Sequence, residues 1–178
     1  MSVTSTEPAR APSAAPSRSI LAIGAVAIAV GVVLRFVTRS DLWLDEALSV
    51  NIASLPLDQL PDALRQDGHP PLYYALLHGW MAMVGEGDAA VRALSGILSV
   101  AALPLVWLAA RRRGGPDLAW IAVVVLACSP FAIRYATETR MYALVMVLVL
   151  VGFLAVDRAL ERPTAGRLVG VTLVAAAL

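Results

Sequence analysis

The chain has 178 residues, of which 59% are hydrophobic and 15% are charged, and its formal net charge is +1. Soluble proteins average about 25% charged residues, so this composition excludes an ordinary soluble domain and predicts a membrane protein. No block of the chain is basic enough to bind nucleic acid. The single cysteine, Cys128, excludes a disulfide within the chain.

Residues 1–18 are rich in Ser, Pro and Ala and hold almost no large apolar side chain. They cannot bury enough apolar surface to fold, so they are predicted to form a disordered tail. Residues 19–178 are predicted to form one membrane domain. Its first apolar run, 20–34, reaches Val37 if Arg35 snorkels, and then approaches the roughly 20 residues that cross a bilayer. A cleaved signal peptide is the alternative, but no clear Ala-x-Ala site precedes the charges.

Further apolar runs follow at residues 72–84, 89–110, 118–136, 141–156 and 168–178. The first of these is too short to span and carries His78, so an interfacial or re-entrant helix is expected there. The others, with run 20–34, predict about five spans in an all-α, polytopic transmembrane helix bundle. The last run stops after 11 residues, about half a span. We therefore expect the chain to be the N-terminal part of a longer protein.

Arginine placement predicts the orientation, because cytoplasmic loops are enriched in basic residues. The basic segments 111–113 and 158–167 both lie in the cytoplasm only if the chain crosses out and back between them. Residues 134–140 then form a second outer loop. If residues 38–88 contain no crossing, they form the first outer loop and the tail is cytoplasmic, which the arginines of the tail favour. The chain is thus expected to be a multi-pass protein of the cell membrane with both polar loops outside.

Leucine and isoleucine recur at helical spacing in the first outer loop. The positions before and after Pro56 are Leu44, Leu48, Ile52 and Leu55, then Leu57, Leu60 and Leu64. This spacing predicts two short amphipathic helices on the membrane surface. A third is expected from Leu72, after the break at Pro70 and Pro71.

Three carboxylates stand in "SDLWLDEALSV", where the first outer loop begins: Asp41, Asp45 and Glu46. On a helix the side chains of Asp45 and Glu46 diverge by about 100°, so they cannot aim at one atom. We expect one to act and the other to orient. The alternative is that Asp41 or Asp45 caps the helix that begins there.

A second polar group, "SPFAIRYATETRMYAL", contains Arg134, Glu138 and Arg140. Two arginines near the carboxylates of the first loop predict a phosphate clamp, because guanidinium presents forked donors to phosphate oxygens. The alternative is an ion pair between Arg134 and Glu138, with Tyr135 anchored at the interface. His69 precedes the double proline, near a helix start where anions are favoured, although a loop hydrogen bond also explains it.

The segments "LWLDEALS", "GHPPLYYALLHGW", "AAVRALSGILSV", "RRRGG" and "SPFAIRYATETRMYAL" occur in this order. Together they resemble the N-terminal part of the polytopic GT-C glycosyltransferases. The resemblance is to the protein-mannosyltransferase-like family, which includes protein O-mannosyltransferases, aminoarabinose transferases and galacturonosyltransferases, and it covers residues 20–178. It implies that Asp45 and Glu46 are the acidic pair of the active site, with Asp45 as general base. It also implies a polyprenyl-phosphate sugar donor and an extracytoplasmic acceptor, which is a protein, glycan or lipid.

The expected mechanism is a single displacement with inversion, in which Asp45 takes a proton from the acceptor hydroxyl. Arg134 or Arg140, with His69, is expected to stabilise the departing lipid phosphate. Glu46 is expected to orient the donor or, with His69, to help hold a divalent cation if one is used. The supporting residues are Glu138, Tyr135 and Arg92.

The resemblance also implies a later outer loop that this chain lacks, so the chain alone is expected to be inactive. A transporter or lipid flippase is the main alternative function, and a structural membrane subunit is another. A transporter usually carries charge near the midplane and broken helices in corresponding halves. Here the charges gather at one face, which favours an enzyme.

Overall fold

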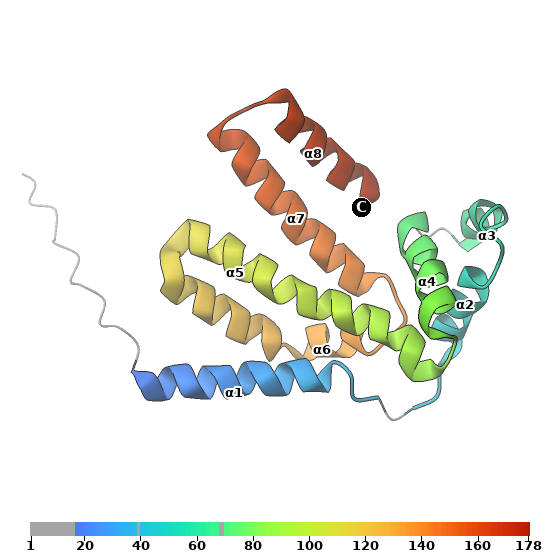
Figure 1. Cartoon of the computed structure of the whole chain (residues 1–178), viewed down its shortest axis with the longest axis horizontal. Coiled ribbons are helices and arrows are strands. Elements are labelled where there is room, and N and C mark those ends of the chain that lie inside the picture. Colours follow the sequence, from blue (N-terminus) through green and yellow to red (C-terminus); the bar gives the residue numbers. More distant parts are fainter. Residues whose placement is uncertain (1–16, 39, 68–69) are drawn as a thin grey trace, which may run out of the picture.

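The computed structural model describes residues 17–38, 40–67 and 70–178 (Figure 1). Within these ranges the regular structure is entirely α-helical, in eight helices. They are α1 (Arg18–Leu34), α2 (Leu44–Ala53), α3 (Leu60–Asp67), α4 (Pro71–Val84), α5 (Asp88–Ala127), α6 (Pro130–Ala136), α7 (Tyr142–Glu161) and α8 (Ala165–Ala177). The predicted all-α membrane bundle is confirmed. Residues 1–16 of the expected tail lie outside the described residues, and Arg18 is the first residue of α1.

Helix α5 is two antiparallel arms joined by a tight turn. Gly114 and Gly115 leave the helical conformation there, and Gly115 has a φ of +77°, which glycine adopts without steric cost. The two arms lie side by side in the bundle (Figure 1). Among the described helices, α5 and α7 are long and apolar enough to cross a membrane, while α1 and α8 are apolar but shorter.

The apolar run 118–136 does not form the single span that its composition predicts. Helix α5 ends at Ala127, and the short helix α6 begins at Pro130. Proline has no N–H to donate, and it disfavours helical backbone at the residue before it. Ser129 accordingly has an extended backbone (ψ 119°), and its side chain caps α6 by accepting from the backbone N–H of Ala132.

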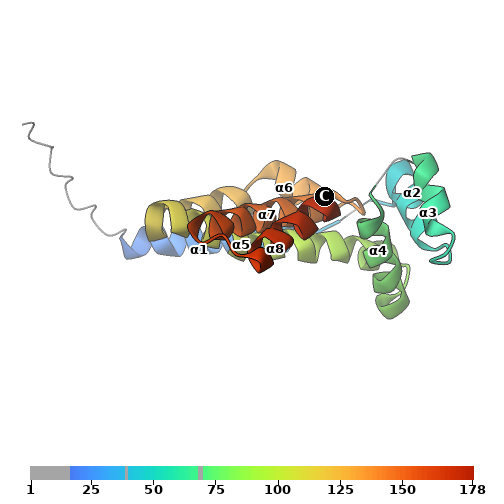
Figure 2. The ribbon, with the colours of Figure 1, turned by 90° about the horizontal axis from the view of Figure 1, so that it is seen from above.

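The bundle has two chemically different ends. The start of α1, the turn within α5 and the connection from α7 to α8 lie at one end, whereas α2, α3 and α4 lie at the other (Figures 1 and 2). The basic segments 111–113 and 158–167 lie close together at the first end. Ion pairs join the two regions: Arg112 pairs with Asp157 at 3.0 Å and with Glu161 at 2.7 Å. We call this the arginine end, and the opposite end the loop end.

Near the loop end, the buried side chain of Arg35 joins α1 to both arms of α5. It is 1% exposed and therefore does not snorkel as expected. Its Nε donates to Ser99 Oγ at 2.9 Å, Nη1 to the carbonyls of Gly31 (2.6 Å) and Ala127 (2.8 Å), and Nη2 to the carbonyl of Leu126 (2.8 Å). The last carbonyls of a helix have no partner within the helix and carry partial negative charge. Arg35 supplies that partner.

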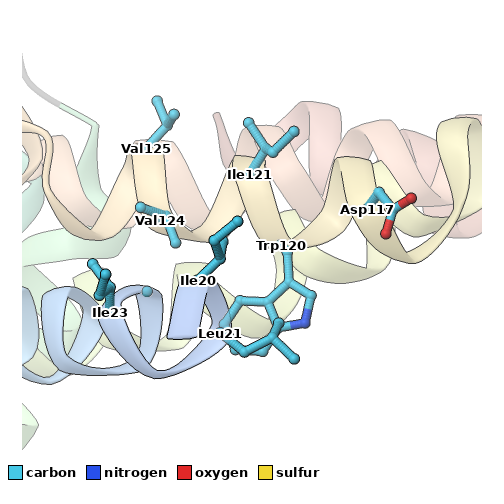
Figure 3. A pocket seen from close by; sticks show the side chains of 9 residues that line it. Ile20, Leu21, Ile23, Asp117, Trp120, Ile121, Val124 and Val125 are labelled. Atoms are coloured by element: carbon cyan, nitrogen blue, oxygen red, sulfur yellow. The ribbon is translucent and has the colours of Figure 1, made fainter. Parts of the chain in front are cut away.

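A groove of about 460 Å³ lies between α1 and the second arm of α5, toward the arginine end (Figure 3). Its walls are Ile20, Leu21, Ile23, Gly24, Trp120, Ile121, Val124 and Val125, with Asp117 as the charged lining residue. Such walls match lipid chains rather than polar substrates. The described residues that were singled out for chemistry lie at the loop end.

The close contact between α1 and α5 depends on Gly31. A Cβ added there would meet the Ala127 carbonyl carbon at 2.8 Å, whereas one added at Gly24 would meet Val124 Cγ2 at an ordinary 3.5 Å. We expect Gly31→Ala to lower the free energy of unfolding by about 1–3 kcal/mol through overpacking. Gly24→Ala, the matched control on the same helix, should be neutral or slightly stabilising, because alanine favours a helix by about 1 kcal/mol over glycine. Thermal unfolding in detergent micelles measures both; equal melting temperatures would contradict this account of the contact.

Candidate active site

Helix α2 carries the acidic pair in its first turn. Its N-cap is Trp43, so neither Asp41 nor Asp45 caps the helix. The buried residues of α2 are Glu46, Ser49, Ile52 and Ala53. By contrast, Leu44 is 83% exposed and Leu48 43% exposed. The helix therefore turns a carboxylate and a hydroxyl toward the bundle and leaves two predicted apolar positions at its surface.

A compact apolar core fixes the predicted surface helices to the bundle. It consists of Ile52, Ala53, Leu60, Leu64, Tyr73, Tyr74, Leu77, Met81, Val91, Leu94 and Leu144. These residues come from α2, α3, α4, α5 and α7, so the three short helices of the predicted first outer loop pack on the starts of two long helices. His78 adds a hydrogen bond from its Nδ1 to the Ala53 carbonyl oxygen at 2.8 Å. These contacts thus hold α2, which carries the acidic pair, against the bundle.

Glu46 is fully buried and forms an ion pair with Arg92 from α5. Arg92 Nε donates to Glu46 Oε1 at 2.8 Å, and Nη2 donates to Oε2 at 2.6 Å. Oε1 also accepts from the backbone N–H of Thr139 at 2.8 Å, and Oε2 from that of Trp43 at 3.4 Å. One carboxylate therefore joins α2, α5 and residues 134–140, the predicted second outer loop.

The environment of Glu46 keeps it ionised and leaves it unsuited to a metal ion. Burial raises the pKa of Glu46. The pKa is lowered by more through the hydrogen bonds from Arg92, Thr139 and Trp43 and through the charge of Arg92. The pKa of Glu46 therefore lies below its ordinary value. A carboxylate offers about four lone-pair sites, and four N–H groups occupy them. The described residues also contain no cluster of three or more potential metal ligands. Metal binding by Glu46 does not fit this arrangement.

Arg92 also fixes the segment that leads into α2. Its Nη1 donates to the carbonyl of Ser40 at 2.6 Å and its Nη2 to the carbonyl of Asp41 at 3.0 Å. Four of the five guanidinium N–H groups of Arg92 are thus used in holding Glu46 and the backbone before it. These four donors of Arg92 thus face protein groups.

The second outer loop is held by polar contacts that the sequence analysis missed. Tyr73 OH lies 3.2 Å from Ser95 Oγ, which donates to the Arg140 carbonyl at 3.3 Å. Thr139 is fully buried and is tied to Glu46 through its backbone. The available signal was the spacing of Arg92, Ser95 and Ser99, which places three polar residues on one face of an apolar helix.

Asp45 and Arg140 lie together at the loop end. Asp45 is exposed, and its carbonyl accepts from Arg140 Nη1 at 3.4 Å. Burial lowers the pKa of Arg140, whereas the hydrogen bond with Tyr142 and the negative charge of Asp45 raise the pKa by more. The Arg140 guanidinium thus bonds to the backbone of an exposed acidic residue, whose charge acts on the pKa of Arg140.

Arg134 is 62% exposed in its side chain and pairs with Glu138 at 3.0 Å, as the simpler alternative predicted. Its guanidinium also lies 5.9 Å from the centre of the Trp43 ring. Tyr135 packs on Tyr142, with ring centres 4.5 Å apart. His69 lies outside the described residues. Every other predicted site residue is at the loop end, on α2, α5 or the second outer loop.

The apolar helices of the bundle identify the chain as a membrane protein. The charged residues gathered at its loop end identify a polar site there. More particularly, the profile of the family described as dolichyl-phosphate-mannose-protein mannosyltransferase matches residues 68–178, more than half of the chain. The chain therefore belongs to this mannosyltransferase-like family of membrane glycosyltransferases. The matched residues include Arg92, Arg134 and Arg140 but not Asp45 or Glu46. No curated protein and no solved structure matches the chain.

Removing Arg92 should destabilise the protein strongly, because it leaves the Glu46 carboxylate buried and uncompensated. For Arg92→Met we expect a loss of about 3–5 kcal/mol in the free energy of unfolding. Arg65→Met removes one partner of an ion pair with Asp62 in which both side chains are exposed, and it should change the free energy of unfolding little. Unfolding in mixed detergent micelles measures both variants; a similar small change in both would contradict a central role for the buried pair.

The lowered pKa of Glu46 also predicts a dependence of stability on pH. In the unfolded chain the Glu46 carboxylate takes up a proton near its ordinary pKa of 4.5. In the folded protein it does so only at a lower pH. The stability that the ionised form contributes is therefore complete above about pH 4.5 and is lost as the pH falls through the folded pKa. We expect the melting temperature of wild type to drop more between about pH 5 and pH 3 than that of Glu46→Gln. Parallel curves would show that Glu46 does not titrate as described.

Proposed function

We propose that the chain forms part of a GT-C-type glycosyltransferase that moves a sugar from a polyprenyl-phosphate donor to an extracytoplasmic acceptor. The observation that carries this proposal is the closeness of exposed Asp45 to Arg140, which bonds to the Asp45 carbonyl, at the loop end of a mannosyltransferase-like chain. A base and a cation side by side match a reaction in which a proton leaves one reactant and negative charge builds on the other.

The proposed reaction is a single displacement with inversion. Asp45 accepts the proton of an acceptor hydroxyl while that oxygen forms a bond to the anomeric carbon of the sugar. The bond between this carbon and the phosphate oxygen breaks, and its electron pair leaves with the lipid phosphate. Arg140 stabilises the developing charge on the phosphate as a fixed donor. The carboxyl proton of Asp45 is then released to water, so the base is restored.

The geometry revises the roles of two further candidates. Glu46 holds α2 in place through Arg92 and Thr139, which supports a positioning role. Arg134 is engaged by Glu138 at the protein surface. Arg140 bonds to the carbonyl of Asp45, the proposed base. Of the two arginines first considered for the phosphate, Arg140 is the one we assign.

We further propose that the arginine end faces the cytoplasm and the loop end faces outside, in a multi-pass protein of the cell membrane. Support comes from the meeting of the two basic segments at one end, where Arg112 bonds to Asp157 and Glu161. Cytoplasmic loops favour such basic residues. The start of α1 lies at the same end, which agrees with a cytoplasmic N-terminus (Figure 1).

Replacing the proposed base should abolish most transfer without affecting folding. We expect Asp45→Asn in the full-length protein to reduce transfer of labelled sugar from polyprenyl-phosphate donors by about 10²- to 10⁴-fold. The matched control is Asp62→Asn, an exposed carboxylate elsewhere in the same loop (77% exposed), which should keep wild-type activity. Near-normal transfer by Asp45→Asn at equal expression would refute the assignment.

Replacing Arg140 should weaken stabilisation of the leaving phosphate. For Arg140→Gln we expect a fall of about 10²-fold in kcat, since a preorganised donor to developing charge contributes on this order. Arg65→Gln is the control, because Arg65 is an exposed arginine that pairs with Asp62 in α3. Steady-state kinetics in detergent checks both; a change confined to KM would instead point to ground-state binding.

A further inference from the structure

A polar pocket of about 440 Å³ opens at the loop end, separate from the pair of Asp45 and Arg140. We call it the Trp43 pocket. The described residues that line it are Val37, Thr38, Ser40, Asp41, Trp43, Glu46, Arg92, Thr137 and Glu138. They come from the segment between α1 and α2, from α5 and from the second outer loop, so the ion pair of Glu46 and Arg92 forms part of the wall.

The lining combines the groups that recognise carbohydrate. Thr38, Ser40 and Thr137 carry hydroxyl groups, which both donate and accept hydrogen bonds as sugar hydroxyls do. Carboxylates of Asp41 and Glu138 add acceptors. Trp43 is 51% exposed. The Arg134 guanidinium lies 5.9 Å from the centre of its ring, and the exposed part of the ring offers an apolar surface to the C–H groups of a sugar. A few polar groups and an aromatic wall in a pocket of this size are typical of small-molecule sites.

The described part of this lining disfavours a phosphate. Arg92 has four of its five N–H donors engaged by Glu46, Ser40 and Asp41. The carboxylate of Glu138 lies at the pocket, while its partner Arg134 is bonded to it at 3.0 Å. Among the described lining residues, the carboxylates therefore outnumber the arginines, and the arginine is already neutralised.

We propose that the Trp43 pocket binds a neutral sugar ring, with its hydroxyls on the polar wall and its apolar face on Trp43. The inference rests on the proposed function, which supplies a sugar on the donor and can supply another on a glycan acceptor. It deepens that function by separating the site into two parts. The ring lies in the Trp43 pocket, and the charged chemistry lies at Asp45 and Arg140.

Saturation-transfer NMR on the purified full-length protein tests this without any transfer reaction. The probes are the methyl α-glycosides of mannose, glucose and galactose up to about 50 mM, a range that covers weak millimolar binding. The micelles are of an amine-oxide detergent, which contains no sugar. We expect saturable binding of at least one glycoside and a roughly tenfold weaker Kd in Trp43→Ala, the size of an aromatic contact. The control, Trp120→Phe, alters a tryptophan in the groove far from this pocket and should leave the Kd unchanged.

Competition distinguishes the two sources of the ring. Displacement of the glycoside by polyprenyl-phosphomannose, but not by polyprenyl phosphate, would assign the pocket to the sugar of the donor. Displacement by neither would assign it to an acceptor sugar. Both outcomes support the proposal.

Three results would overturn it: no saturable binding of any probe, an unchanged Kd in a folded Trp43→Ala protein, or displacement by inorganic phosphate or polyprenyl phosphate. Folding of Trp43→Ala is checked by its melting temperature, and Asp41→Asn provides a second variant that should weaken binding. If a glycoside binds but no sugar is transferred, the proposed function is rejected and sugar binding in the Trp43 pocket stands. If sugar is transferred but no glycoside binds, the proposed function stands and sugar binding in the pocket is rejected.

Discussion

The buried ion pair between Glu46 and Arg92 is the interaction on which the loop end depends. Taking two charges out of water is costly, and their attraction offsets this only when the remaining hydrogen-bonding capacity is satisfied. Here the carboxylate accepts four N–H groups and the guanidinium reaches two backbone carbonyls. The pair thereby fixes three segments that are far apart in the sequence. Without it, the first turn of α2 would lose its attachment to α5.

This attachment explains how adjacent carboxylates acquire different roles. On one helical turn, burial of Glu46 directs Asp45 away from the bundle, because neighbouring side chains diverge by about 100°. Asp45 therefore remains at the surface, beside Arg140, whose carbonyl is held by Ser95. The rigid carboxylate positions the accessible one. In the proposed function, the alignment of the base thus comes from the buried carboxylate next to it in the sequence.

Much of this architecture is predictable from apolar periodicity and proline positions. The helices after Trp43 and after Pro70, the turn at Gly114 and the gathering of polar residues from two loops follow from local patterns. The break before Pro130 could have been predicted from the same rules, but the unbroken apolar composition on both sides concealed it.

The pairing of Glu46 with Arg92 and the burial of Arg35 could not be predicted in this way. Each depends on contacts between segments more than 40 residues apart, and a single sequence gives no measure of such proximity. Composition also suggests the opposite for Arg35. A lone arginine at the end of an apolar run usually reaches toward the interface, whereas here the carbonyl ends of two helices supply enough acceptors to keep it inside.

The outward-facing leucines of α2 have a consequence for how substrate arrives. Leu44 and Leu48 are exposed on the helix that carries Asp45, so insertion of these side chains into the bilayer surface would set the height of the carboxylate relative to the lipid headgroups. In the proposed function, a donor anchored in the same leaflet would already be at that height. Its encounter with the enzyme would then be a search in two dimensions, governed by the density of donor per membrane area rather than by its concentration in solution.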